Sequence, residues 1–254
     1  RSYNGLVFKL KEHIQRLYNS ALAIRLTINM SKQDMANEVV RTLKRNKLKD
    51  AYIRLIVTRG AGDLGLDPRK CRKHNVIIIA HKIQLYPKEF YEKGLHIITA
   101  ATRRNLPSAL DPRIKSLNYL NNILAKLDAI DAGCEEAIML TYDGYVAECT
   151  GDNLFIIKNK KLMTPPVKIG ALEGITRGEV ISIAKSRKIR CYERMLRPND
   201  IYGSDECFLT GTAAEIIPVV MVDFKKIAKG QPGHITKIFT EDFHKLTKTQ
   251  GVKY

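Results

Sequence analysis

The chain has 254 residues, and its 43 Lys and Arg against 26 Asp and Glu give it a formal net charge of +17 at pH 7. Its content of 44% hydrophobic and 27% charged residues is ordinary for a globular protein, and its apolar runs are too short to cross a bilayer. The five cysteines are scattered without a Cys-x-x-Cys pair, which argues against a disulfide framework and against a zinc site. We therefore expect a cytoplasmic protein without a membrane span or a metal centre.

The positive charge is spread along the chain rather than gathered in one block. Basic residues alternate with carboxylates in amphipathic segments such as residues 31–50, a pattern typical of a solvated helix face. Trp is absent and aromatic residues make up only 7%, so no platform for stacking nucleic-acid bases is evident. Nucleic-acid binding is therefore a remote alternative, and we expect no nucleic-acid partner.

The first part of the chain predicts two helices followed by two strands. Apolar residues recur at helical spacing over 10–24, and Ser31 fits the N-cap of a second helix. The segments 51–60 and 75–83 have the composition of strands and are separated by a loop rich in Gly and Asp. Residues 86–94 are interpreted as a connection to the next region.

The next part predicts a strand over 95–103 and a helix over 114–132 that stops at Gly133. Two hairpins follow, one around Asp143-Gly144 and one around Asn159, because each of these turn signals separates two apolar runs.

The last part predicts a helix over 176–188, strands over 206–210 and 216–223, and a C-terminal helix over 234–248. Consecutive hairpins favour antiparallel sheets over a parallel βαβ array. The order of elements therefore indicates an α+β fold with two unlike subdomains, a small one over 1–88 and a larger one over 89–254.

The stretch "ALEGITRGEV" at 171–180 places Gly174 and Thr176 just ahead of a helical apolar pattern. One interpretation is ordinary capping, in which the Thr oxygen accepts a hydrogen bond from an N–H group of the first turn. The other is an anion site, because free N–H groups and the helix dipole favour a phosphate. The segment alone leaves both open.

Six segments together resemble one family, the fold-type IV pyridoxal-phosphate aminotransferases, and within it the branched-chain amino-acid aminotransferases. They cover essentially the whole chain: "NGLVFKLKEHIQRLYNSA" at 4–21, "AYIRLIV" at 51–57, "IKSLNYLNNILAK" at 114–126, "GYVAECTGDNLFII" at 144–157, "ALEGITR" at 171–177 and "FLTGTAAEIIPV" at 208–219. The resemblance implies a small α/β sandwich and a larger pseudo-barrel of mixed, mainly antiparallel strands with helices, as in D-amino-acid aminotransferases.

The resemblance also implies pyridoxal 5'-phosphate as the cofactor, with Lys115 as the lysine that holds it as a Schiff base. A lysine amine suits this role, because once desolvated it acts first as a nucleophile and then as the base that moves the substrate proton. Glu148 matches the carboxylate that pairs with the pyridine nitrogen, and Tyr119 matches the tyrosine that bonds the ring oxygen. Without the family, these three residues would be a solvated lysine, a strand-end acid and core filler.

The phosphate of the cofactor would be bound by Arg16, by Ile175 and Thr176 at the helix start, and by Thr212. Leu172 matches the apolar residue that packs on the cofactor ring. The ordinary alternatives are an exposed helix arginine for Arg16 and a core leucine for Leu172.

For the substrate, the family supplies N–H groups from Gly211, Thr212 and Ala213 to the α-carboxylate. Tyr52 and Arg54 would reach the side-chain pocket, where a cation among apolar walls accommodates both glutamate and leucine-like substrates. Simple alternation along a half-exposed strand is the alternative interpretation of Tyr52 and Arg54.

The expected function is transamination of L-leucine, L-isoleucine or L-valine with 2-oxoglutarate, giving branched-chain 2-oxo acids and L-glutamate, by a homodimer or higher homo-oligomer. Lys115 and Tyr119 are separated by three residues, one fewer than in many branched-chain enzymes and as in D-amino-acid aminotransferases. A D-amino-acid aminotransferase or an aminodeoxychorismate lyase of the same fold is therefore the alternative. The chain begins at Arg1, inside the family's N-terminal motif, so we expect a fragment whose small subdomain lacks its beginning.

Overall fold

A computed structural model describes residues 1–82 and 86–254 and divides the chain into two compact units. The first unit contains residues 1–83 together with 246–254, and the second contains residues 84–245. This division differs from the expected subdomains, 1–88 and 89–254, in that the C-terminal residues belong to the first unit. The reason is a long-range pairing, because the last strand of the chain pairs with a strand near its beginning.

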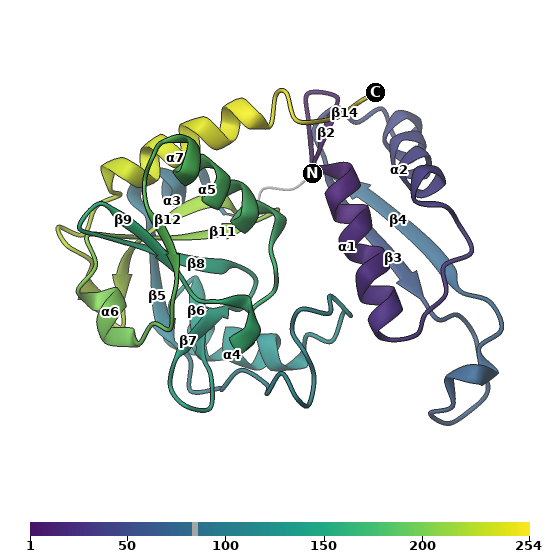
Figure 1. Ribbon diagram of the computed structural model, residues 1–254, viewed down its shortest axis with the longest axis horizontal. Helices are drawn as coiled ribbons and strands as arrows, with labels where there is room; N and C mark the ends of the chain where they lie inside the picture. Colours follow the sequence, from purple (N-terminus) through teal and green to yellow (C-terminus); the bar gives the residue numbers. More distant parts are fainter. Residues whose placement is uncertain (83–85) are drawn as a thin grey trace. The chain divides into compact units, whose positions relative to one another are not determined.

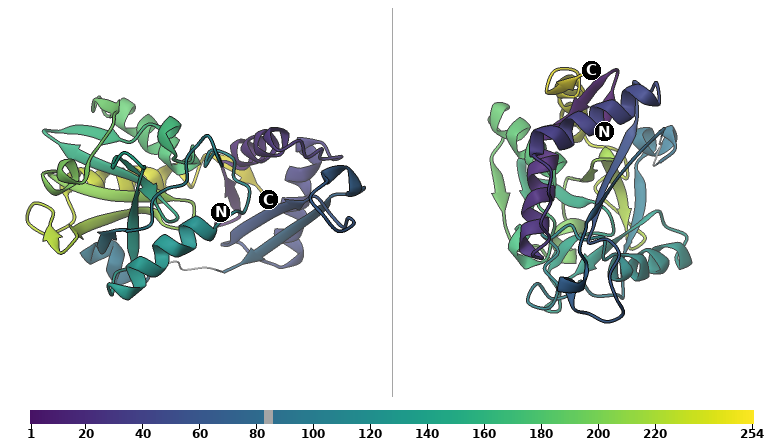
Figure 2. Two further views of the ribbon diagram at one scale, coloured as in Figure 1. Left: turned by 90° about the horizontal axis from the view of Figure 1, so that it is seen from below. Right: turned by 90° about the vertical axis from the view of Figure 1, so that its right-hand side faces the viewer.

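The first unit contains two helices and two small sheets (Figure 1). Its elements are β1 (Ser2–Tyr3), β2 (Leu6–Phe8), α1 (Leu10–Ala23), α2 (Lys32–Arg45), β3 (Tyr52–Thr58), the 3-10 turn η1 (Pro68–Lys70), β4 (Asn75–His81) and β14 (Gly251–Lys253). Figure 2 shows β14 beside the N-terminal strands, and it pairs antiparallel with β2.

The local signals of this unit predict α1, α2, β3 and β4, but not the short strands β1, β2 and β14. Ser31 is the N-cap of α2, where its hydroxyl accepts a hydrogen bond from the Asp34 N–H. The strands β3 and β4 pair antiparallel over their full length. One face of this pair packs on the buried stripes of α1 and α2, so that the alternate strand residues on the other face are left outside this core. Residue 83 of the predicted strand 75–83 lies outside the described residues.

The second unit is built on a nine-stranded mixed sheet in the order β10-β9-β8-β11-β12-β5-β6-β7, with β13 paired to β12. Its strands are β5 (Leu95–Thr99), β6 (Glu136–Leu140), β7 (Val146–Cys149), β8 (Asn153–Lys158), β9 (Lys161–Thr164), β10 (Cys191–Glu193), β11 (Glu206–Gly211), β12 (Glu215–Val222) and β13 (Lys225–Lys226). Both predicted hairpins are present, as β6–β7 and β8–β9. Parallel pairs join β5 to β6 and β12, so the predicted mixed, mainly antiparallel α+β fold is confirmed.

Helices surround this sheet. They are α3 (Lys88–Lys93), α4 (Leu120–Asp131), the 3-10 turn η2 (Val167–Ile169), α5 (Ile175–Ser186), α6 (Pro198–Tyr202) and α7 (His234–Leu246). Along residues 1–82 and 86–254, no helix combines the length and the apolar character that crossing a membrane requires.

Two predictions for this unit are wrong in detail. The segment 86–94 is not a plain connection, because it contains the six-residue helix α3, which is too short to show a periodicity. The helix predicted over 114–132 begins only at Leu120, because Leu117 has a φ of 65° that an α-helix does not allow. Residues 114–119 therefore form a loop. Gly133, with a φ of 67°, stops the helix as predicted.

Candidate active site

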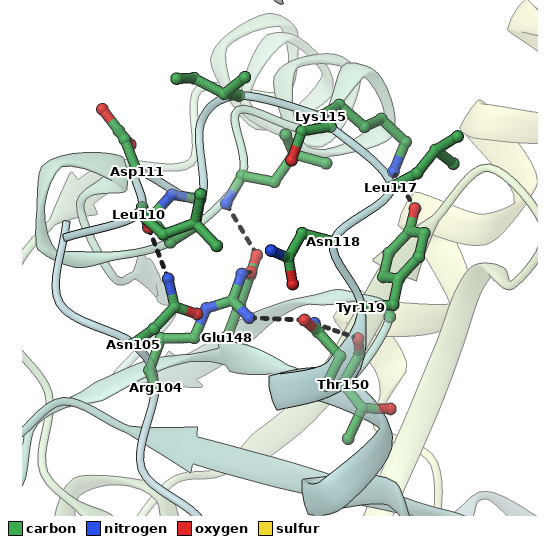
Figure 3. Close-up of a pocket in the computed structure, with 16 residues that line it drawn as sticks. Arg104, Asn105, Leu110, Asp111, Lys115, Leu117, Asn118, Tyr119, Glu148 and Thr150 are labelled. Atoms are coloured by element: carbon green, nitrogen blue, oxygen red, sulfur yellow. Dashed lines mark hydrogen bonds and ion pairs between the residues drawn. The ribbon is translucent and has the colours of Figure 1, made fainter. Parts of the chain in front are cut away.

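A pocket of about 550 Å³, including its open mouth, lies in the second unit (Figure 3). Its walls come from the loop between β5 and α4, the first turn of α4, the end of β7 with the residues that follow it, and the segment before α5. The lining residues include four that the sequence singles out, namely Lys115, Tyr119, Glu148 and Leu172. Long-range folding therefore brings together residues that are up to 57 positions apart, and this is an arrangement expected of a cofactor site.

Glu148, on β7, is buried at the base of the pocket. Its Oε1 accepts a hydrogen bond from Arg104 Nη2 at 2.5 Å, within an ion pair. Its Oε2 accepts from the Leu172 N–H at 2.8 Å and from Asn153 Nδ2 at 3.3 Å. Burial raises the pKa of Glu148, while the Arg104 charge and the Leu172 hydrogen bond act in the opposite direction. The alternative of a solvent-facing strand-end acid is therefore wrong.

Lys115 and Tyr119 lie on the loop before α4. Lys115 Nζ donates to the Tyr119 hydroxyl at 3.2 Å, and Figure 3 shows the two side chains pointing toward each other. Both side chains are exposed. The desolvation expected for Lys115 is therefore not provided by the described residues of the second unit.

The start of α5 carries no side-chain cap. Gly174 is the N-cap and no side chain accepts a hydrogen bond there, so the capping role considered for Thr176 is wrong. Thr176 lies in the first turn instead, where it is buried. A Cβ on Gly174 would lie 2.2 Å from Asn153 Oδ1, so only glycine allows this close approach. Ile175 and Thr176 are not among the residues that line the pocket.

The turn from Gly211 to Ala213 connects β11 to β12. Thr210 pairs with Asn153 of β8, so this turn and the start of α5 both adjoin the beginning of β8. A Cβ on Gly211 would lie 1.9 Å from Asp152 Oδ1, which means that the carboxyl group fills the space of the missing side chain. Neither Gly211 nor Thr212 nor Ala213 lines the pocket.

The remaining predicted residues belong to the first unit. Arg16 is half-buried on α1. Tyr52 and Arg54 lie on the same face of β3, opposite His81 and Ile79 of β4. This face therefore places Arg54 beside Ile79, and the role of Tyr52 and Arg54 in a substrate pocket stays a prediction.

Sequence reasoning missed two residues that hold Glu148 in place. Arg104 belongs to a basic stretch, "TRRN", that looks like an ordinary surface loop. Asn153 ends the motif "ECTGDN", and its Nδ2 also donates to the Leu172 carbonyl at 2.9 Å. Asn153 could have been identified from the sequence, because a polar side chain at the start of a buried strand requires a hydrogen-bond partner. Nothing local distinguishes Arg104.

Comparisons with known proteins agree with this geometry. The family described as amino-transferase class IV matches residues 1–222. A protein of Methanocaldococcus jannaschii named "Putative branched-chain-amino-acid aminotransferase" is 49% identical over 253 residues, which are 100% of this chain and 87% of that protein. The branched-chain-amino-acid aminotransferase of Escherichia coli K12 is 35% identical over 248 residues, or 96% of this chain and 80% of that protein.

Solved structures are similar over the same length. The crystal structure of the Escherichia coli branched-chain amino acid aminotransferase has a TM-score of 0.94 and 34% identity, covering 96% of this chain and 83% of that one. That of the T.th. branched-chain enzyme complexed with N-(5'-phosphopyridoxyl)-L-glutamate has a TM-score of 0.91 and 33% identity, covering 98% and 83%.

The chain therefore belongs to the class IV aminotransferases, as its six motifs predict. Within that class it falls in the branched-chain-amino-acid aminotransferase family, given its identity to relatives of that name over nearly its full length.

Proposed function

We propose that the chain is a pyridoxal-phosphate-dependent aminotransferase that moves the amino group of L-leucine, L-isoleucine or L-valine to 2-oxoglutarate, giving L-glutamate and branched-chain 2-oxo acids. The observation that carries this proposal is the pocket in which Lys115, Tyr119, Glu148 and Leu172 meet. Relatives support it, because structures of the T.th. enzyme contain pyridoxamine 5'-phosphate, N-(5'-phosphopyridoxyl)-L-glutamate or 4-methylvaleric acid.

The residues present fit this cofactor. A carboxylate offers about four acceptor positions, and the described residues fill three of those on Glu148, which leaves one on Oε1 for a ring N–H. The N–H groups of the first turn of α5 have no intrahelical acceptor and no side-chain cap, and this arrangement suits a phosphate.

When bound, pyridoxal phosphate supplies an electron sink for the charge left on the substrate Cα after its proton is removed. Glu148 would lie beside the ring nitrogen and hold a proton on it through its negative charge. Lys115 would hold the cofactor through its Nζ and would move the proton at the substrate Cα. Tyr119, whose hydroxyl accepts a hydrogen bond from Lys115 Nζ, would orient that amine and bond the ring oxygen, and Leu172 would pack on the ring.

We further propose that Ile175 and Thr176, together with Thr212 and Arg16, bind the phosphate. Replacing Thr176 by Val removes the hydroxyl at nearly constant volume, so it is expected to weaken cofactor retention more than it lowers the melting temperature. Thr164→Val is the matched control, because Thr164 is equally buried and its hydroxyl bonds the Leu154 carbonyl instead. Equal cofactor loss in the two variants would contradict the phosphate role.

For the substrate, we propose that N–H groups of Gly211, Thr212 and Ala213 bind the α-carboxylate. Tyr52 and Arg54 recognise the side chain, with Arg54 pairing with the γ-carboxylate of glutamate. The guanidinium group suits this task, because it binds a carboxylate through two parallel hydrogen bonds. Arg54→Gln is therefore expected to raise KM for 2-oxoglutarate more than KM for leucine.

The experiment that tests the function begins with cofactor-saturated protein. A yellow chromophore is expected, and borohydride reduction should attach it to the peptide that contains Lys115. Lys115→Ala should abolish the adduct and Lys185→Ala, an exposed lysine on α5, should retain it. Parallel assays with L-leucine, D-alanine and aminodeoxychorismate then separate the branched-chain enzyme from the two alternatives. An adduct on another lysine would refute the assignment.

We also infer that the chain forms a homo-oligomer through an exposed apolar stripe on α4. Five large side chains on this helix are between 44% and 66% exposed, while its buried contacts come from Ala125 and Ala129; the five are Leu120, Ile123, Leu124, Leu127 and Ile130. An apolar stripe of this kind marks an interaction surface. It adjoins the loop of Lys115, so a second copy seated there would lie beside that loop.

Native mass spectrometry tests this inference. The wild-type protein is expected at a multiple of 28.8 kDa, and the double variant Ile123→Glu, Leu127→Glu at 28.8 kDa. Leu22→Glu, at an exposed leucine on α1, is the control and should retain the assembly. A wild-type chain found only as a monomer would contradict the inference.

The expected cytoplasmic location stays a prediction.

A further inference from the structure

Arg104 is a buried arginine whose guanidinium group is held from three separate parts of the chain. Nε donates to the Gly170 carbonyl at 2.9 Å, and Nη1 donates to Asn122 Oδ1 on α4, also at 2.9 Å. Nη2 donates to Glu148 Oε1 at 2.5 Å (Figure 3). The Arg104 N–H additionally donates to the Leu140 carbonyl at the end of β6. Hydrogen bonds of both its backbone and its side chain therefore hold the positive charge of Arg104 in one position.

The charge faces a carboxylate that burial alone would neutralise. A buried carboxylic acid prefers to keep its proton unless a cation or hydrogen bonds stabilise the charged form. The positive charges that favour the ionised form of Glu148 are those of Arg104, Lys115 and Arg177, and the neighbouring carboxyl group of Asp152 has a pKa raised to about 8. Arg104 exerts the strongest stabilising effect among them, through an ion pair in which both side chains are less than 10% exposed.

The contacts also determine the direction in which Glu148 points. Oε2 is occupied by the Leu172 N–H and by Asn153, so the acceptor position left for a ligand is on Oε1, the oxygen that Arg104 binds. Asn122 ties this arrangement to the pocket wall, because its Oδ1 holds Arg104 and its Nδ2 holds the Thr150 carbonyl at 2.7 Å.

We propose that Arg104 is a positioning residue for the aminotransferase reaction, which keeps the Glu148 carboxylate ionised and directs the remaining acceptor position of Oε1 toward the ring nitrogen of the cofactor. This inference rests on the proposed function. Arg104 does not touch the reacting atoms; it acts through Glu148. A protonated Glu148 could not hold the ring nitrogen in its protonated form, because both groups would then compete to donate.

A double-mutant cycle of Arg104→Met and Glu148→Gln tests this proposal. The readouts are the dissociation constant of pyridoxal phosphate, the pH midpoint of the cofactor absorbance and the melting temperature. Arg104→Met is expected to weaken cofactor binding at least about tenfold and to shift the absorbance midpoint. In the Glu148→Gln background the same change should alter binding less than about twofold, because no carboxylate is left to position. Arg104→Lys, which keeps the charge and loses the planar fork, should fall between wild type and Arg104→Met.

A purely structural role gives a different pattern. Arg104→Met would then lower the melting temperature and weaken binding equally in both backgrounds, and this result would overturn the proposal. If Arg104→Met does not fold, Asn122→Ala provides the second test, because it retains the arginine and removes one of its anchors. Its expected effect is a shift of the absorbance midpoint relative to wild type, and an unchanged midpoint would overturn the proposal. Failure of the proposed function is recognised separately, because the wild-type chain would then form no adduct at Lys115.

Discussion

Protonation of the Asp152 carboxyl group is expected to make the free energy of unfolding depend on pH. The side chain is buried beneath Gly211, and burial, together with the negative charges of Glu136 and Glu148, raises its pKa to about 8. In an unfolded chain an aspartic acid has a pKa of about 4. Between these two values the folded state keeps a proton that the unfolded state has released. The free energy of unfolding therefore falls as the pH rises from about 4 to about 8, and this contribution is fully present only below about pH 4.

Replacing Asp152 by Asn removes this proton and retains the shape of the side chain. One bound proton corresponds to a slope of about 1.4 kcal/mol per pH unit, so from pH 5 to pH 7 the stability of Asp152→Asn relative to wild type should rise by about 3 kcal/mol. For a chain of this size that amounts to roughly 5–10 °C in melting temperature.

Calorimetric melting of both proteins at pH 5, 6, 7 and 8 measures the difference. Asp131→Asn, at the exposed end of α4, is the matched control and should follow the wild-type pH dependence. If the melting temperatures of Asp152→Asn and wild type differ by a constant amount across this pH range, the reasoning is refuted. Asp152 would then release its proton at the same pH in the folded and unfolded states.

Three further predictions concern backbone positions. Gly178→Ala is expected to stabilise the protein by about 0.5–1 kcal/mol in thermal melting, because the exposed site in α5 has nothing within 4 Å of a new Cβ and Ala favours helix; a lower melting temperature would contradict it. Gly211→Ala should destabilise by about 1–3 kcal/mol through its clash with Asp152, and combining it with Asp152→Gly should recover most of the loss. Leu117→Asn should raise stability in denaturant unfolding by about 0.5–1 kcal/mol, because Asn tolerates the positive φ better than Leu; a destabilised variant would show that Leu117 makes contacts that outweigh the strain.

Elements with a strong local signal can be predicted from the sequence alone. The cap at Ser31 and the turns at Gly144 and Asn159 depend on residues within a few positions of each other, and the structure contains the helix and the two hairpins that they predict. The helix before Asp131 shows where such reasoning fails. Apolar residues continue through the loop that precedes α4, so periodicity cannot locate the start of the helix. Periodicity also does not show that the large apolar side chains of this helix are exposed.

For the candidate active site, too, the sequence predicts some residues that the structure brings together and others whose roles stay untested. The motifs around Lys115, Glu148 and Leu172 identify the family from the sequence, and the pocket brings these residues together. The roles proposed for Arg16, Tyr52 and Arg54 stay predictions, because they belong to the other unit.

The sequence by itself therefore determined the α+β character, most of the helices and hairpins, and the family, because those depend on local patterns and on motifs in order. The tertiary structure alone decided that Arg104 holds Glu148, that Asp152 fills the space beside Gly211, and that the last strand closes the first unit. The physical reason is that burial, ion pairing and the resulting proton affinities arise between residues distant in the chain, and no local pattern records which of them will meet.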